Sequence, residues 1–134
     1  MVSGHPDLFP RTIHQIREIY NEIFLAQIID NDPNNEPDGK VFRKNSVYIH
    51  DGFNNIHTGL FPEEEIIRQV KLSLKMVEDP EIPGMIKIAC FHFMFGYIHP
   101  FYDGNGRLNR YLSALFLLHD LRCPCCHASF NSYT

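Results

Sequence analysis

The sequence contains no apolar run long enough to cross a membrane. The longest apolar stretch, Ile86 to Ile98, is interrupted by Lys87 and His92, whereas a span needs about 20 predominantly apolar residues. The first residues also lack the basic and apolar segments of a secretory signal peptide. We therefore expect a cytoplasmic protein without a membrane partner.

An excess of positive charge is also missing. Twelve Lys and Arg residues face sixteen Asp and Glu residues, which gives a formal net charge of -4. This balance excludes a general attraction to nucleic acid or to an acidic membrane. Any binding of phosphate must therefore use local basic residues.

Cysteines are few, and no two pairs have the spacing of a zinc finger. Cys90 lies in an apolar helical stretch and is expected to be a reduced core residue. The cluster Cys123-Pro124-Cys125-Cys126-His127 looks like a metal site only superficially, and its role stays open. Free thiols and a reducing compartment are the simplest interpretation.

The length of 134 residues suits one domain, residues 1–134, with one core. Four segments carry apolar residues at helical spacing and are predicted as helices: 11–29, 62–78, 85–98 and 105–118. The segment 85–98 is apolar on nearly all sides, which predicts a central, buried helix. Short pieces at 41–43 and 47–49 are typical of extended chain and predict a small hairpin or irregular arm. The expected fold is mostly α with one small β-like arm.

The densest group of chemically useful side chains lies between the last two predicted helices, at His99-Pro100-Phe101-Tyr102-Asp103-Gly104-Asn105-Gly106-Arg107-Leu108-Asn109-Arg110. Gly104, Asn105 and Gly106 lie at a helix N-terminus, where N–H groups lack intrahelical partners and the helix dipole is positive. Glycine lets the backbone approach a ligand closely. The pattern predicts an anion cradle, with phosphate as its commonest occupant, although simple capping is the alternative.

Charged residues on both sides of the glycines support phosphate binding. Arg107 and Arg110 are three residues apart on the helix, and their guanidinium groups match phosphate oxygens, unless they are ordinary surface arginines. Asp103 would be repelled by a bare polyphosphate, so we expect Mg²⁺ between them. The alternative for Asp103 is a helix N-cap.

His99 is the candidate general base, because histidine titrates near neutral pH and can accept a proton from a hydroxyl. A structural role is the alternative for any single histidine. Pro100 disfavours helical geometry at His99, so the preceding helix should end there and leave His99 at the mouth of the cradle. Phe101 is expected to point inward and anchor the loop.

This stretch resembles the Fic domain signature H-x-F-x-[D/E]-G-N-G-R-x-x-R, with every specified position present. The similarity extends over about residues 39–121, including Phe61-Pro62 at the start of a long helix. The resemblance implies a Fic-type helical core with a small β-hairpin flap. It also implies a protein adenylyltransferase, which transfers AMP from ATP to a Ser, Thr or Tyr hydroxyl and releases pyrophosphate.

The resemblance further implies a role for each residue of the motif. His99 would deprotonate the target hydroxyl, and Asp103 would bind Mg²⁺. The α- and β-phosphates would be held by Gly104, Asn105 and Gly106, with help from Arg107. Arg110 would reach the γ-phosphate. The flap, about residues 47–58, would bind an extended segment of the target protein by strand addition. His57 lies in this segment as a candidate target-facing residue.

Two departures from the family concern regulation and size. No Ser or Thr begins the inhibitory pattern [S/T]-x-x-x-E-[G/N], so inhibition would come from a separate protein or be absent. The chain ends soon after Leu121, where family members continue, so the C-terminal part of the fold looks short or missing, and a homo-oligomer could compensate. Removal of AMP, transfer of another phosphate-containing group and a non-catalytic nucleotide- or partner-binding module remain alternatives.

Overall fold

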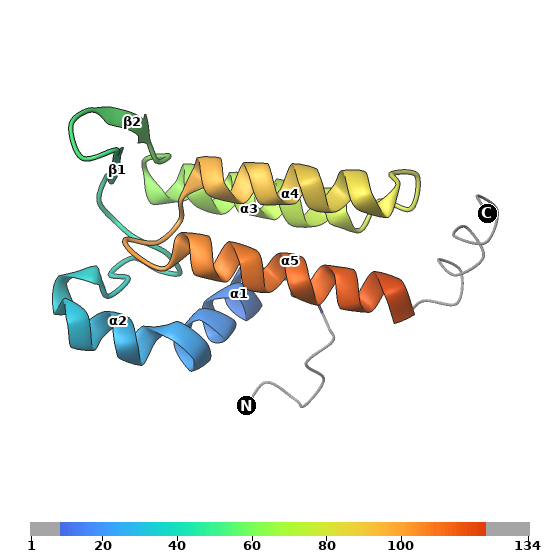
Figure 1. The fold of residues 1–134 in the computed structure, drawn as a ribbon, viewed down its shortest axis with the longest axis horizontal. Helices are drawn as coiled ribbons and strands as arrows, with labels where there is room; N and C mark the ends of the chain where they lie inside the picture. The colour runs from blue at the N-terminus through green and yellow to red at the C-terminus, as the bar shows by residue number, and fades with distance from the viewer. Residues whose placement is uncertain (1–8, 123–134) are drawn as a thin grey trace.

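The computed structural model describes residues 9–122, and most of them are helical. The elements follow in the order α1 (Ile13–Tyr20), η1 (Asn21–Leu25), α2 (Ala26–Asn31), η2 (Pro33–Asn35), β1 (Tyr48–His50), β2 (Asn55–Thr58), α3 (Glu63–Val77), α4 (Gly84–Ile98) and α5 (Asn105–Arg122). The predicted fold class, a helical core with a two-stranded hairpin, is confirmed (Figure 1). Within residues 9–122, none of the helices combines the length and apolarity that a bilayer crossing requires.

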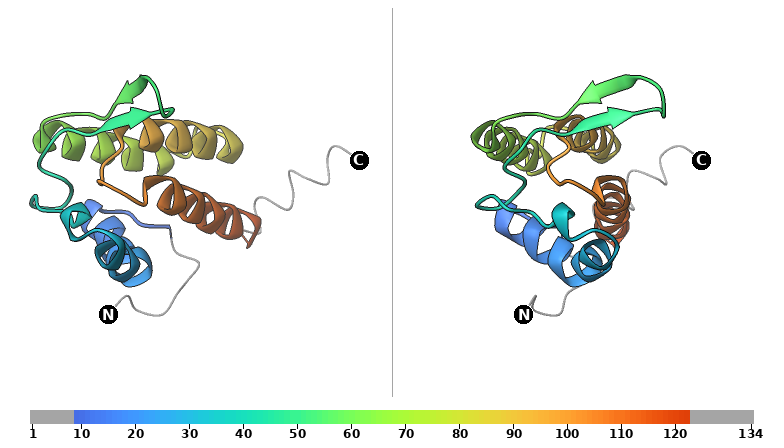
Figure 2. Two further views of the ribbon diagram at one scale, coloured as in Figure 1. Left: turned by 60° about the vertical axis from the view of Figure 1, so that its left-hand side comes forward. Right: turned by 90° about the vertical axis from the view of Figure 1, so that its left-hand side faces the viewer.

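Three long helices form the body of the molecule. α4 packs against α3 on one side and against α5 on the other, while the N-terminal helices lie beside the beginning of α5 (Figures 1 and 2). The core is built from buried apolar side chains of all these helices: Ile16, Tyr20, Ile66, Val70, Phe91, Phe95, Leu108 and Leu112. The loop between α4 and α5, which carries the motif, therefore lies where the N-terminal helices meet the long-helix layer.

The N-terminal helix begins at a capping box and is not one regular helix. Thr12 accepts a hydrogen bond from the Gln15 backbone, and the Gln15 side chain accepts one from Thr12. A π-helical turn then separates α1 from α2. This wider turn changes which side chains face inward, so Ile23 is 45% exposed while Ile28 is buried. The predicted stripe of apolar residues at regular helical spacing over 11–29 is therefore continuous only in its first half.

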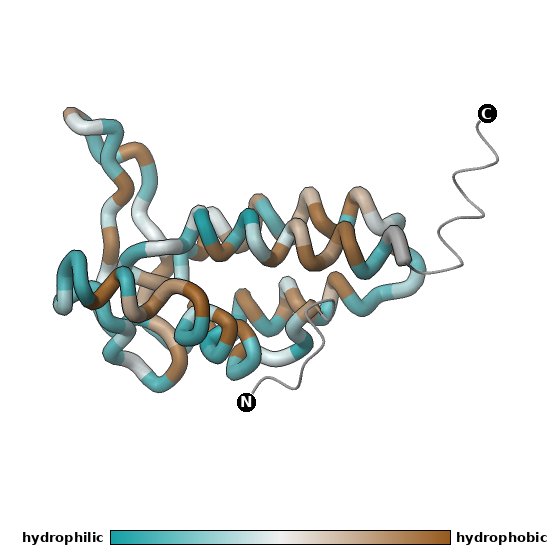
Figure 3. Tube along the Cα trace, turned by 60° about the horizontal axis from the view of Figure 1, so that its bottom comes forward, coloured by the Kyte–Doolittle hydropathy of each residue, from teal (hydrophilic) through white to brown (hydrophobic). Residues whose placement is uncertain are grey.

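The prediction that α4 is a central, buried helix is confirmed for its position between α3 and α5 and is wrong for its outer face. Its inner face, which includes Phe91 and Phe95, is buried, whereas Phe93 and Tyr97 on the opposite face are exposed. Cys90 is also exposed and is not the core residue that its apolar neighbours indicated. In the part of the chain that the structure describes, α3 and α5 leave the outer face of α4 open, although apolar residues recur along the whole length of the long helices (Figure 3).

The hairpin lies beside the C-terminal end of α4. β1 and β2 pair antiparallel, with Ile49 opposite His57 and an irregularity directly after Ile49. The Leu60 N–H donates to the Ile98 carbonyl, which joins the end of the hairpin segment to the end of α4. The predicted extended piece at 47–49 is confirmed with a shift of one residue, since β1 spans Tyr48–His50.

The other predicted extended piece, 41–43, forms no strand. Its main chain is bound differently: the Glu63 carboxylate accepts from the N–H groups of Lys40, Val41 and Phe42, and the Arg43 N–H donates to the Pro100 carbonyl. The backbone N–H groups of residues 40–42 are therefore bound by a carboxylate at the start of α3 and not by a neighbouring strand. The Cys123–His127 cluster lies outside the described residues.

Candidate active site

His99 occupies an unusual backbone conformation at the end of α4. Its N–H donates to the Phe95 carbonyl, while its φ of 55° and ψ of 63° lie in the left-handed region. α4 ends at Ile98, as predicted from Pro100. A non-glycine residue in this conformation costs of the order of 1–3 kcal/mol, so the surrounding structure must impose it.

Asn105 holds the motif loop in shape. Its side-chain oxygen accepts from the Phe101 N–H at 2.9 Å, and its amide donates to the Phe101 carbonyl at 2.8 Å. Phe101 is fully buried and stacks on Tyr20 with 3.8 Å between ring centroids, so the predicted inward anchor is confirmed. The side chain of Asn105 is thus engaged within the protein, and its backbone N–H is the group that it can offer to an anion.

Gly104 is the N-cap of α5, since its carbonyl accepts from the Leu108 N–H. Its φ is 84°, and a Cβ at this position would lie 2.8 Å from Cδ1 of Ile28. The N-cap interpretation of Asp103 is therefore wrong: Asp103 precedes the cap, and its Oδ1 accepts from the Gly104 N–H at 2.7 Å. The Asp103 side chain as a whole is half-exposed just before the helix.

Arg107 lies between the motif loop and the N-terminal helices. It donates to Oε1 of Gln27 at 3.0 Å, and its other terminal nitrogen lies 3.9 Å from Oδ2 of Asp103. The guanidinium also lies over the ring of Phe24, 5.7 Å from its centroid. Sequence reasoning missed Gln27, because nothing in a helical stripe of residues 11–29 indicates a contact with the motif.

Arg110 is exposed on the next turn of α5. A Cβ added at Gly106 would lie 3.3 Å from Nη1 of Arg110, so the guanidinium lies close to the N-terminal turn of the helix. The structure thus brings the glycines and both arginines to one helix end. This is an arrangement that can bind an anion with several negative oxygens.

The imidazole of His99 is held in its neutral form. Burial is the main cause that lowers its pKa to about 4, and the positive charge of Arg43 and the nearby His57 act in the same direction. A hydrogen bond with the backbone of Gly96 and the charge of Asp103 oppose this shift. At neutral pH the imidazole is therefore unprotonated, which leaves one ring nitrogen as a hydrogen-bond acceptor.

Tyr20 fixes the other side of the loop. Its hydroxyl donates to the Asp103 carbonyl at 3.0 Å, and burial together with the Asp103 charge raises the pKa of Tyr20 to about 12. The sequence marked Tyr20 as part of an apolar stripe only. A buried tyrosine usually has a hydrogen-bond partner, and that is the signal that could have pointed to this contact.

Asp103 fits a magnesium ion that is shared with phosphate. Among residues 9–122 no three His, Cys, Asp or Glu side chains gather into a closed metal site. Mg²⁺ commonly uses one or two carboxylates and completes its shell with water and substrate phosphates. A single half-exposed carboxylate next to an anion cradle matches this pattern.

His57 is turned toward α4. Its Nε2 lies 2.7 Å from the Tyr97 carbonyl, and its ring packs on that of Tyr97. Its contacts thus join the flap to the last turn of α4 and do not indicate a target-facing side chain.

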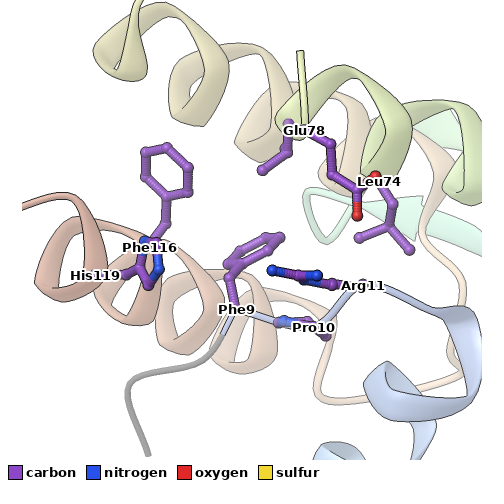
Figure 4. Close-up of a pocket in the computed structure, with 8 residues that line it drawn as sticks. Phe9, Pro10, Arg11, Leu74, Glu78, Phe116 and His119 are labelled. Atoms are coloured by element: carbon purple, nitrogen blue, oxygen red, sulfur yellow. The ribbon is translucent and has the colours of Figure 1, made fainter. Parts of the chain in front are cut away.

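A separate cavity of about 360 Å³ lies between the N-terminal segment, α3 and α5 (Figure 4). Its lining includes Phe9, Arg11, Leu74, Phe116 and His119. No motif residue contributes to this cavity, so it is not part of the candidate active site.

Comparisons with known proteins agree with the motif. A model of the Fic/DOC family matches residues 10–117. A crystal structure of a Fic family protein from Desulfovibrio desulfuricans is similar, with a TM-score of 0.62 and 22% sequence identity over 80% of this chain. The match covers 30% of that protein, so this chain corresponds to less than a third of its length. At this identity the likeness shows the fold alone.

Proposed function

This chain belongs to the Fic/DOC family, and on that premise we propose that it is a protein adenylyltransferase that moves AMP from ATP to a hydroxyl of a target protein. The observation that carries the proposal is the neutral His99 imidazole in the same loop as the glycine-rich N-terminus of α5. A site that only bound a nucleotide would have no use for a base in this position.

The polyphosphate binds at the N-terminus of α5. The backbone N–H groups of Asn105 and Gly106 are offered to the α- and β-phosphates, whereas the Gly104 N–H is bound by Asp103. The close packing of Gly104 against Ile28 keeps this backbone in place. Arg107 and Arg110 neutralise negative charge, with Arg110 directed to the γ-phosphate. Asp103 is the residue that would hold Mg²⁺, which neutralises phosphate charge when bound.

His99 carries the proton transfer. The imidazole accepts the proton of the target hydroxyl while that oxygen forms a bond to the α-phosphorus and the bond from the α-phosphorus to the bridging oxygen breaks. Pyrophosphate leaves with the electron pair of the broken bond. Positioning of the two reactants and neutralisation of charge supply most of the rate enhancement.

The target protein binds at the flap. The hairpin of β1 and β2 is an isolated two-stranded sheet within residues 9–122, so each strand has an edge that can pair with an extended peptide. The hydrogen bond between Leu60 and Ile98 supports this proposal, because it joins the hairpin segment to the end of α4, next to His99. A separate inhibitory protein and a second copy of this chain are the other partners that we propose.

Labelled ATP tests the proposal. The full chain is incubated with Mg²⁺, cell lysate and ATP that carries the label on either the α- or the γ-phosphate. We expect protein-bound label from the α-position only, and its loss in a His99→Ala variant. Label from the γ-position would identify a kinase, and ATP binding without covalent label would identify a binding module.

A further inference from the structure

Arg43 is the largest fully buried side chain that carries a charge. Within residues 9–122, its guanidinium donates only to main-chain carbonyls: to Asn45 at 2.8 Å, Leu60 at 2.6 Å, Ile98 at 3.2 Å and His99 at 2.8 Å. Among the ion pairs within residues 9–122, none involves Arg43. The charge is thus placed against backbone dipoles rather than against a carboxylate.

The position of the guanidinium explains why a buried charge is tolerated there. The last carbonyls of a helix have no intrahelical partners and carry the negative end of the helix dipole. Arg43 satisfies the Ile98 and His99 carbonyls at the end of α4 from a distant part of the chain. Burial lowers the pKa of Arg43, but arginine keeps its proton in proteins.

The same residue fixes the conformation of His99. The Nε of Arg43 holds the His99 carbonyl, and the backbone N–H of Arg43 holds the following carbonyl, that of Pro100, at 3.1 Å. Two consecutive carbonyls are therefore oriented by one residue, directly at the position where the backbone is left-handed. This supplies the constraint that a left-handed histidine requires.

Gly59, which follows β2, packs against both Arg43 and His99. A Cβ at Gly59 would lie 2.6 Å from Nη2 of Arg43 and 3.2 Å from Cβ of His99. Only a residue without a side chain fits between the guanidinium and the histidine without displacing one of them. The hairpin, Arg43 and His99 consequently form one packed unit.

We propose that Arg43 is a positioning residue for the base, which fixes His99 beside the phosphate cradle by holding the carbonyls of the turn that follows α4. The inference rests on the proposed role of His99 in the reaction. Arg43 touches neither of the proposed reactants and acts only through His99. Its charge also favours the neutral imidazole, together with His57 and against Asp103.

Substitutions at Arg43 test this inference in the full chain. Arg43→Lys keeps the charge but cannot reproduce the planar set of donors, and Arg43→Met removes the charge. Gly59→Ala displaces the guanidinium without removing it, which provides a test if both Arg43 variants unfold. Arg68→Lys is the matched control, because Arg68 is an exposed arginine on α3 that pairs with Glu65.

Two readouts are measured and normalised to the folded fraction. We expect Arg43→Lys to lower kcat about 100-fold with an unchanged KM for ATP, the effect of misplacing a catalytic group by about 1 Å. We expect the imidazole resonances of His99 in NMR spectra to shift in Arg43→Lys and Gly59→Ala, and its pKa to rise in Arg43→Met. Arg68→Lys should change none of these quantities.

The NMR readout needs no turnover, so it separates this inference from the proposed function. Absence of AMP transfer by the unsubstituted chain would remove the adenylyltransferase proposal but leave the His99 resonances to report on Arg43. Unchanged resonances and an unchanged kcat per folded molecule in Arg43→Lys, or in Gly59→Ala where Arg43→Lys does not fold, would overturn the inference. A loss of activity that matches the loss of folded protein would overturn it as well.

Discussion

The Nε of Arg43 donates a hydrogen bond to the main-chain oxygen of His99 at 2.8 Å, across 56 positions of sequence. This bond connects the segment before the hairpin to the residue that we propose as the base. It also lies where α4 ends and the motif loop begins. The geometry of the candidate site therefore depends on a contact between two residues that lie far apart in the sequence but side by side in the structure.

The protonation of His99 gives the first prediction. Because burial lowers its pKa to about 4, its imidazole should titrate well below an ordinary histidine in an NMR pH titration. Between the folded pKa and the unfolded value of about 6.5, the unfolded chain binds more protons, so stability falls as the pH decreases through this window. Urea unfolding at pH 7.5 and pH 5 should show a smaller loss in His99→Gln than in the unsubstituted chain. An equal loss in both would contradict the shift.

The second prediction concerns the cap of α5. Gly104→Ala places a Cβ in a left-handed residue and against Ile28, and we expect the free energy of unfolding to fall by at least about 2 kcal/mol. Gly106→Ala is the matched control, because its Cβ would meet the flexible end of the Arg110 side chain. Urea denaturation of both variants checks this. A similar stability for the two variants would argue against the close packing of the cap.

The third prediction concerns Glu63, whose carboxylate binds the backbone N–H groups of residues 40–42. Glu63 accepts from three consecutive backbone N–H groups, which lower its pKa against the opposing effect of burial. Glu63→Gln should lower the free energy of unfolding by about 1–3 kcal/mol at neutral pH. Since the pKa is lowered on folding, this contribution should vanish as the pH falls through the folded pKa. Glu64→Gln, at an exposed neighbouring position, should change stability by less than about 0.5 kcal/mol.

The fourth prediction tests the metal role of Asp103. Asp103→Asn should weaken ATP binding in the presence of Mg²⁺, because the proposed ligand is removed. Without Mg²⁺ the same variant should bind ATP as well as, or better than, the unsubstituted chain, because a negative charge beside the phosphates is lost. Calorimetric titration with and without Mg²⁺ measures both. A loss of affinity that is the same in both conditions would contradict a role in metal binding.

The sequence predicted those features that are encoded locally. Helical spacing located the four helical segments, and Pro100 marked the end of α4 at Ile98. The motif itself was sufficient to recognise the family that the comparisons then identified. Phe101 was correctly expected inside because an aromatic residue in a polar loop needs a place to pack.

Features that depend on distant contacts could not be predicted in this way. Nothing around Arg43 in the sequence indicates that its partners are Leu60, Ile98 and His99. The exposure of Cys90 likewise follows from which faces of α4 its neighbours cover, and not from the apolar residues beside it. Gln27 could not be connected to Arg107 before the N-terminal helices were placed against the motif loop.

The central claim is that His99 drives transfer of AMP to a protein hydroxyl. The most direct measurement is mass spectrometry of target peptides from lysate treated with the full chain, Mg²⁺ and ATP that is isotopically labelled in its adenosine. The account predicts a Ser, Thr or Tyr residue that carries labelled adenosine with one phosphate, formed by the unsubstituted chain and absent with His99→Ala. A peptide that carries phosphate without adenosine, or an adduct that forms equally well with His99→Ala, would contradict it.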